Sequence, residues 1–168
     1  MMQLSLSIDS SLLVRDVAGD YRPANADEVL QAARRVLAGQ MRGCEALTSP
    51  QVVRDFLRVK LGALEHEVFA VIHLDAQNRV IDYVEMFRGT VSQTSVYPRE
   101  VVKEALARNS AALLLVHNHP SGVAEPSRAD ETLTQTLKSA LGLVAVRVLD
   151  RLIVAGSAIL SFAERGLL

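Results

Sequence analysis

Hydrophobic residues repeat every three or four positions in four stretches of the chain, and each stretch predicts a helix. The four stretches cover residues 29–37, 49–62, 98–109 and 127–141. In the second stretch, Ser49 can cap the helix and Pro50 suits its first turn. These stretches alternate with segments of a different pattern, so helices are only part of the predicted fold.

Apolar runs typical of strands separate the helices. They lie at residues 68–74, 79–87, 111–116 and within 144–154. A turn at residues 75–78 joins the first two runs, which therefore predict a β-hairpin. Residues 89–95 read as irregular or edge-like. The order of helix, hairpin, helix, strand, helix and strands predicts an α/β (α+β) protein with a mixed β-sheet flanked by helices.

The first 44 residues differ in pattern from the rest of the chain. A short alternating piece at residues 3–8 and a turn-rich stretch through Gly19 and Pro23 precede the first predicted helix. The whole chain has 168 residues, which is about the size of one domain. We therefore predict an N-terminal appendage over residues 1–44 and one principal domain over residues 45–168.

The composition is that of a packed globular protein. Hydrophobic residues make up 49% of the chain and charged residues 22%, which excludes a wholly disordered chain. The single cysteine, Cys44, has no partner for an internal disulfide. Neither a signal peptide nor an apolar run long enough to span a bilayer is visible. We expect a cytoplasmic protein that does not contact membranes.

The charge balance weakens a nucleic-acid function. The chain has eighteen Lys and Arg residues and nineteen Asp and Glu residues, for a formal charge of -1. It lacks the basic excess of a protein that binds the phosphate backbone. Aromatic residues make up 4% of the chain and Trp is absent, so few side chains can stack on bases. A local basic patch stays compatible with this composition.

Two histidines at the end of the strand predicted at residues 111–116 carry the main chemical signal. Side chains alternate between the two faces of a strand, so His117 and His119 point to one side and Asn118 to the other. Two imidazole nitrogens on one side suit a metal ion. For the pair alone, structural histidines bonded to nearby backbone are an equally good interpretation.

Asp130 comes eleven residues after His119, in the first turn of the helix predicted from Ser127. It can fold back to the strand end and add an oxygen ligand, which leaves a fourth position open for water, as in catalytic zinc sites. Ser127 and Asp130 also resemble a capping box that serves only the helix N-terminus. The histidine pair favours the metal interpretation.

The run His-Asn-His-Pro-Ser-Gly at residues 117–122, followed by Pro126-Ser127-x-x-Asp130, resembles the JAMM (MPN+) metalloprotease motif of bacterial RadC-like proteins. The similarity covers roughly residues 49–168. It implies the MPN/JAB architecture, which is cytidine deaminase-like. It also implies one Zn2+ per chain, bound by the two histidines and Asp130.

The same resemblance implies two catalytic residues and an activity. Glu67 stands just before the strand predicted at residues 68–74, as the family's general base does, and would take a proton from metal-bound water. Glu65 and Glu85 are weaker candidates, and a solvated charge is the alternative interpretation of Glu67. Ser127 would donate a hydrogen bond to the oxyanion of a tetrahedral intermediate. The implied protein is a metallopeptidase or isopeptidase acting on a peptide or protein substrate.

The chain departs from the family pattern in three places. Arg151 and Tyr97 stand where the family tends to have histidine, and we expect neither to touch the metal ligands. Residues 1–44 do not show the helix-hairpin-helix segment that full-length relatives usually carry for DNA contact. The alternative functions are therefore a DNA-repair-associated DNA-binding protein or nuclease, and a non-catalytic MPN scaffold. A homodimer is a reasonable further expectation.

Overall fold

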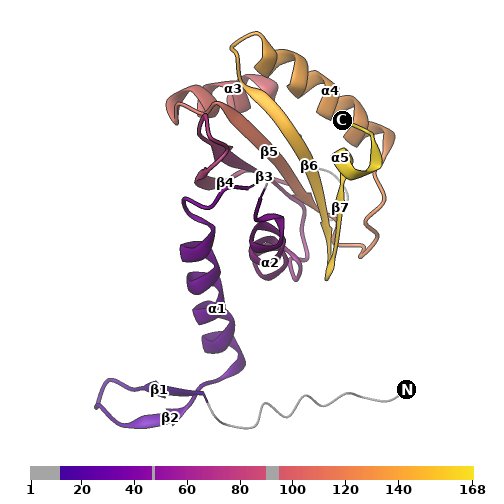
Figure 1. Cartoon of the computed structure of the whole chain (residues 1–168). Coiled ribbons are helices and arrows are strands. Elements are labelled where there is room, and N and C mark those ends of the chain that lie inside the picture. Colours follow the sequence, from indigo (N-terminus) through magenta and orange to yellow (C-terminus); the bar gives the residue numbers. More distant parts are fainter. Residues whose placement is uncertain (1–11, 47, 90–94) are drawn as a thin grey trace.

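The centre of the protein is a mixed five-stranded sheet (Figure 1). The computed structural model describes residues 12–46, 48–89 and 95–168. The strands of the sheet are β3 (Val68–Leu74), β4 (Val80–Arg88), β5 (Ala112–Asn118), β6 (Arg147–Ala155) and β7 (Ala158–Ser161). Their order is β4-β3-β5-β6-β7, in which β5 and β6 are parallel and the other neighbours antiparallel. The predicted hairpin and mixed sheet are confirmed.

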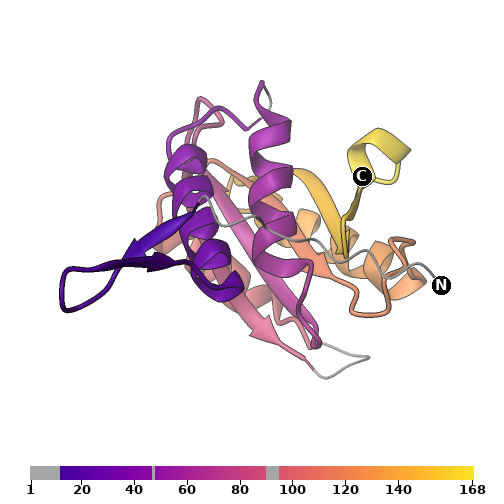
Figure 2. The same ribbon diagram turned by 90° about the horizontal axis from the view of Figure 1, so that it is seen from below.

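Helices cover both faces of this sheet (Figure 2). The helices around the sheet are α2 (Pro50–Leu61), α3 (Pro98–Ala107), α4 (Arg128–Gly142) and the short α5 (Phe162–Arg165). Alternation along β3 creates the two faces: Ile72 packs in the cluster that contains α2, whereas Val71 packs with α3 and α4. The strand β3 is buried throughout because both of its faces are covered.

The N-terminal part extends away from this body (Figure 1). Helix α1 (Ala26–Met41) begins after Asn25, whose side chain caps it, and ends with the buried Met41 in the core. A small hairpin of β1 (Leu13–Arg15) and β2 (Tyr21–Pro23) lies at its far end, where the sequence predicted only turns. The domain boundary at residue 44 stays a prediction.

The predicted helices agree with the structure to within a few residues. Ser49 stands at the N-cap of α2 without a side-chain cap bond, and Ser127 caps α4. The segment predicted at residues 3–8 and most of residues 89–95 lie outside the described residues. In the described part of the chain, no helix combines the length and apolar character needed to cross a membrane.

The connection between β5 and β6 places the candidate residues together. Parallel neighbours need a crossover, and α4 supplies it here. The chain leaves the carboxyl end of β5, turns at residues 119–122, and enters α4 beside that strand end. Such strand ends are where open α/β sheets bind ligands. The two histidines and the first turn of α4 therefore meet at this edge.

Candidate metal centre

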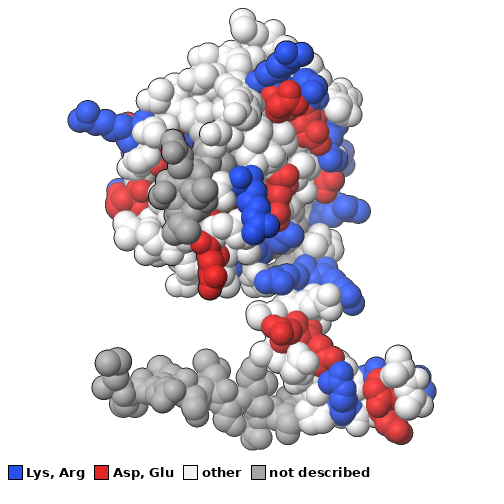
Figure 3. All heavy atoms as spheres, turned by 180° about the vertical axis from the view of Figure 1, so that it is seen from behind, with Lys and Arg blue, Asp and Glu red and all other residues white. Residues whose placement is uncertain are grey.

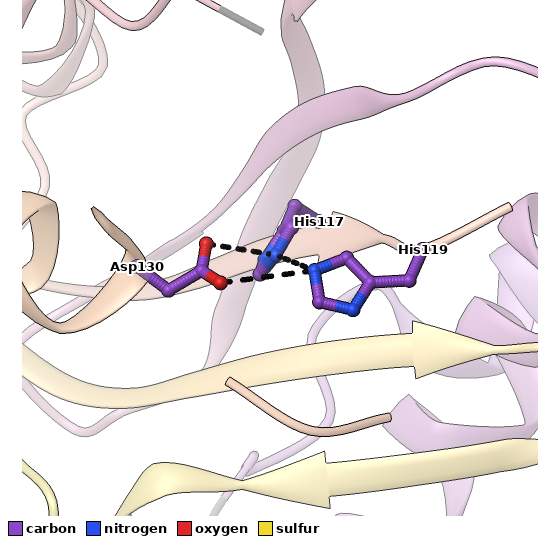
Figure 4. Close-up of side chains that lie close together, drawn as sticks. All are labelled: His117, His119 and Asp130. Atoms are coloured by element: carbon purple, nitrogen blue, oxygen red, sulfur yellow. Dashed lines mark hydrogen bonds and ion pairs between the residues drawn. The ribbon is translucent and has the colours of Figure 1, made fainter. Parts of the chain in front are cut away.

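Three side chains converge at the carboxyl end of β5 (Figure 4). The Nε2 atoms of His117 and His119 lie 2.8 Å apart. Asp130 presents Oδ1 to His117 Nε2 at 3.1 Å, and its Oδ2 lies 3.7 Å from His119 Nε2. One donor atom from each residue lies within 4.8 Å of the other two, an arrangement that can hold a metal ion. The structure thus brings together the three residues that the sequence singled out.

The surroundings of two of these groups prepare them for metal binding. The side chain of His117 is 8% exposed and that of Asp130 is 13% exposed. Burial lowers the pKa of His117 to about 4, so its imidazole is neutral at pH 7. Burial opposes ionisation of Asp130, but hydrogen bonds with His117 and Ser127 outweigh it and hold the pKa below its ordinary value. A neutral imidazole and a carboxylate are the forms that bind metals.

Asp130 belongs both to the helix cap and to the cluster. Its Oδ2 accepts hydrogen bonds from the backbone N–H of Ser127 at 2.8 Å and from the Ser127 hydroxyl at 2.6 Å. The Ser127 oxygen in turn accepts from the Asp130 N–H, which completes a capping box. The two interpretations of the Ser-x-x-Asp spacing are therefore compatible, because the cap fixes the carboxylate that faces the histidines.

The loop after β5 orients His119. Its Nδ1 lies 2.8 Å from the carbonyl oxygen of Val123, so Nδ1 carries a proton and donates it. Gly122 has φ +78°, and its N–H donates a hydrogen bond to the His119 carbonyl, as expected of the Ser-Gly turn. A carbonyl acceptor on the outer nitrogen leaves Nε2 of His119 with its lone pair, the usual state of a metal-binding histidine.

Arg151 touches the cluster directly, contrary to the expectation that it would not. Its Nη2 donates to Asp130 Oδ1 at 2.8 Å and lies 3.2 Å from His117 Nδ1. Its Nη1 donates to the Asp130 carbonyl and to Thr134 Oγ1, each at 2.9 Å. The side chain is 1% exposed. Burial lowers its pKa to about 10, opposed by the charge of Asp130, so the guanidinium is charged at pH 7.

The sequence contains one indication that Arg151 is buried and paired, which the sequence analysis did not use. The residue stands inside the apolar run of β6, where a charged side chain has to find a buried partner. Tyr97, the second departure from the family pattern, is an exposed residue before α3 whose ring packs edge-on against Phe87. Only the first of the two departures contacts the cluster.

The segment around Glu67 lies beside the cluster. In the β3–β5 pair, Phe69 is opposite His117 at the end of the register, and the N–H of Val68 bonds to the side chain of Asn118. Opposite residues share a face of the sheet. The carbonyl of Glu67 accepts from the N–H of Gly89 at 2.8 Å. Glu67 therefore stands two residues before the strand position that pairs with His117.

The two weaker glutamate candidates lie elsewhere. Glu85 pairs in register with Ala70, which packs on the α2 side of the sheet, and it forms an ion pair with Lys60 at 3.1 Å. Glu65 is exposed before β3. Glu85 therefore lies on the other sheet face from His117.

Fold and cluster together define the class: a mixed α/β domain with a His-His-Asp group at a strand-to-helix edge, able to hold a metal ion. A family model described as RadC-like JAB domain matches residues 47–167. That match covers most of the chain. The protein belongs to the RadC-like JAB domain family.

Curated relatives agree with this assignment. A UPF0758 protein of Leptothrix cholodnii is 60% identical over 150 residues, which is 89% of this chain and 68% of the relative. Another, from Methylibium petroleiphilum, is 55% identical over 167 residues, 95% of this chain and 75% of the relative. A third, from Aromatoleum aromaticum, is 62% identical over 146 residues, 86% and 65% of the two chains. All three relatives are longer than this chain.

Proposed function

We propose that this protein is a zinc-dependent hydrolase of the JAMM type that cleaves an amide bond in a peptide or protein, as a metallopeptidase or isopeptidase. The observation that carries the proposal is the His-His-Asp cluster, whose donor atoms lie within 4.8 Å of one another. Two imidazole nitrogens and a carboxylate oxygen suit zinc, and three protein ligands leave a fourth position for water or substrate. The residues present therefore fit the ion.

His117, His119 and Asp130 would hold the ion. When bound, Zn2+ lowers the pKa of water from about 15.7 to about 7 and polarises the carbonyl that is attacked. The protein shields two of the three ligands from water, because the side chains of His117 and Asp130 are largely buried. This burial strengthens electrostatic interactions around the reacting bond.

Glu67 is the proposed general base. Its carboxylate takes a proton from the attacking water and passes it to the leaving nitrogen, a role that requires a position beside the ligands. The β3–β5 pair supports that position, since Phe69, two residues after Glu67, lies opposite His117. The Asn118 side chain accepts a hydrogen bond from the N–H of Val68 and donates one to the carbonyl of His66, which holds the backbone on either side of Glu67.

Ser127 is the proposed oxyanion donor. Its hydroxyl donates to Asp130 Oδ2 at 2.6 Å, so it has to turn toward the substrate when the carbonyl oxygen gains charge. The loss of one such donor typically costs about 3 kcal/mol of transition-state stabilisation. The backbone N–H of Ser127 also donates to Asp130 Oδ2, so the carboxylate stays held when the hydroxyl turns.

Metal content tests the proposal. We would purify the protein without a histidine tag, dialyse it to equilibrium against excess zinc, and measure the zinc bound per chain by mass spectrometry of the solutions on both sides of the membrane. The expected result is about one zinc per chain, absent from a folded His117→Ala/His119→Ala variant. A folded wild-type protein that takes up no zinc overturns the proposal, and with it the roles of Glu67 and Ser127.

The surface gives a DNA-binding function little support. On the face shown in Figure 3, acidic and basic side chains are interspersed over the described residues and do not form one basic patch. The formal charge of -1 agrees with this distribution. A non-catalytic scaffold would not need the preserved cluster. The cytoplasmic location and the homodimer remain predictions.

A further inference from the structure

The two histidines of the cluster have outer nitrogens with opposite partners. Nδ1 of His119 faces a carbonyl oxygen, which only accepts hydrogen bonds. Nδ1 of His117 faces Nη2 of Arg151 at 3.2 Å, and a guanidinium only donates. Nδ1 of His117 is therefore the acceptor, and the proton of its neutral imidazole lies on Nε2.

The contacts on the inner nitrogens agree with this tautomer. Nε2 of His117 lies 3.1 Å from Asp130 Oδ1, which can accept its proton. It also lies 2.8 Å from Nε2 of His119, which has a free lone pair because the proton of that ring is on Nδ1. A metal ion binds a nitrogen lone pair. His119 is thus ready to bind a metal through Nε2, whereas His117 carries a proton where the metal would bind.

Arg151 also neutralises the third ligand. Its Nη2 donates to Asp130 Oδ1 at 2.8 Å, so a divalent ion has to share or displace that guanidinium. Further contacts anchor the side chain in place, with Thr134 and the Asp130 carbonyl. The guanidinium carbon lies 5.8 Å from the ring centre of Phe69 and 5.6 Å from that of Phe162. An anchored internal cation therefore stands where metal-binding histidines usually have an acceptor.

We propose that Arg151 is a positioning residue that keeps the metal affinity of the cluster low, by holding His117 in its Nε2–H tautomer and by pairing with Asp130. This inference rests on the proposed metal function of the cluster. Binding then requires the His117 proton to move from Nε2 to Nδ1 and the guanidinium to withdraw from Nδ1. The ring remains neutral throughout, so no other reactant is needed. The cluster is stable without metal and fills only at high zinc activity.

Zinc affinity of two variants tests the role of Arg151. In Arg151→Gln the charge is gone and the amide oxygen can accept a hydrogen bond from a protonated Nδ1 of His117. Arg151→Lys is the matched control, because it keeps the positive charge and has no acceptor. The dissociation constant of zinc would be measured by competition with a chelator. We expect Arg151→Gln to bind about 10- to 100-fold more tightly than wild type, and Arg151→Lys to stay close to wild type.

The outcomes separate this inference from the proposed function. Equal and measurable zinc binding by wild type and Arg151→Gln overturns the role of Arg151 and leaves the metal site standing. A gain of the same size in Arg151→Lys also overturns it, because charge and donor are then irrelevant. A complete absence of binding in all folded proteins overturns both the inference and the metal site.

A measurement on the unaltered protein avoids any folding defect of the variants. Nitrogen-15 NMR of the imidazole rings distinguishes the two neutral tautomers. In metal-free protein we expect the proton of His117 on Nε2 and that of His119 on Nδ1. A His117 ring with its proton on Nδ1 would contradict the proposal whatever the variants do.

Discussion

The side-chain oxygen of Asn118 accepts a hydrogen bond from the backbone N–H of Val68 at 2.7 Å. The nitrogen of the same amide donates to the carbonyl of His66 at 2.9 Å. Glu67 lies between these two residues, so one buried side chain fixes the backbone on both sides of the proposed base. The end of β5 thereby supplies the candidate ligands on one face and the support for the base on the other.

Replacement of Asn118 by alanine should loosen the start of β3. The change leaves the buried N–H of Val68 without its acceptor, and we expect a loss of about 1–3 kcal/mol in the free energy of unfolding. Urea unfolding measures this loss. Hydrolysis should fall as well, while zinc binding stays near wild type because no ligand is altered. Unchanged stability would show that the amide bonds are dispensable.

Glu67 and Asp130 should have separable functions. Glu67→Gln keeps the size of the side chain but cannot take a proton, so we expect normal zinc content and a loss of about 100-fold or more in amide hydrolysis. Asp130→Ala should lose zinc itself, since a ligand is gone. Zinc content and cleavage of a screened peptide substrate check both. Wild-type cleavage by Glu67→Gln would exclude the proposed base.

Gly62, at the end of α2, has no room for a side chain. A Cβ there would lie 2.5 Å from the carbonyl oxygen of Gly156 and 2.6 Å from that of Arg58. We expect Gly62→Ala to lower the free energy of unfolding by about 1–3 kcal/mol through overpacking. Gly39→Ala, in α1 with no atom within 4 Å of the added carbon, is the control. It should be neutral or stabilise by up to about 1 kcal/mol. Urea unfolding of both variants and of the wild type measures these changes in the free energy of unfolding.

His73 should make the fold sensitive to acid. It is fully buried in β3, with Nδ1 2.8 Å from the Ser110 hydroxyl, and its Nε2 has no hydrogen-bond partner among the described residues. Burial, followed by the charge of Arg108, lowers its pKa to about 4. The unfolded chain, with a pKa of about 6.5, therefore binds this proton more readily than the native protein.

The stability linked to His73 is fully present above about pH 6.5 and is lost as the pH falls toward about 4, by up to about 3 kcal/mol. Urea unfolding across this range measures it. A His73→Gln variant removes the ionisable ring and should show a shallower dependence on pH. The same slope in both proteins would mean that His73 does not carry this effect.

Much of the fold could be predicted because the signals are local. Apolar periodicity marked the helices and the central strands, and the Ser127 cap marked the start of α4. Alternation along a strand was enough to place His117 and His119 on one side. The two short strands near the N-terminus escaped prediction because three residues carry too little pattern.

The amino-acid sequence by itself determined the elements, the histidine pair and the position of Asp130 at a helix entrance, since each depends on residues close together in the chain. Only the tertiary structure decided the state of the cluster. Arg151 reaches His117 across 34 residues, through the β5–β6 pairing and the packing of α4. The tautomer that we propose for His117 depends on that contact, and Asp130 accepts a further hydrogen bond from the same guanidinium, because hydrogen-bond partners are set by distance in space.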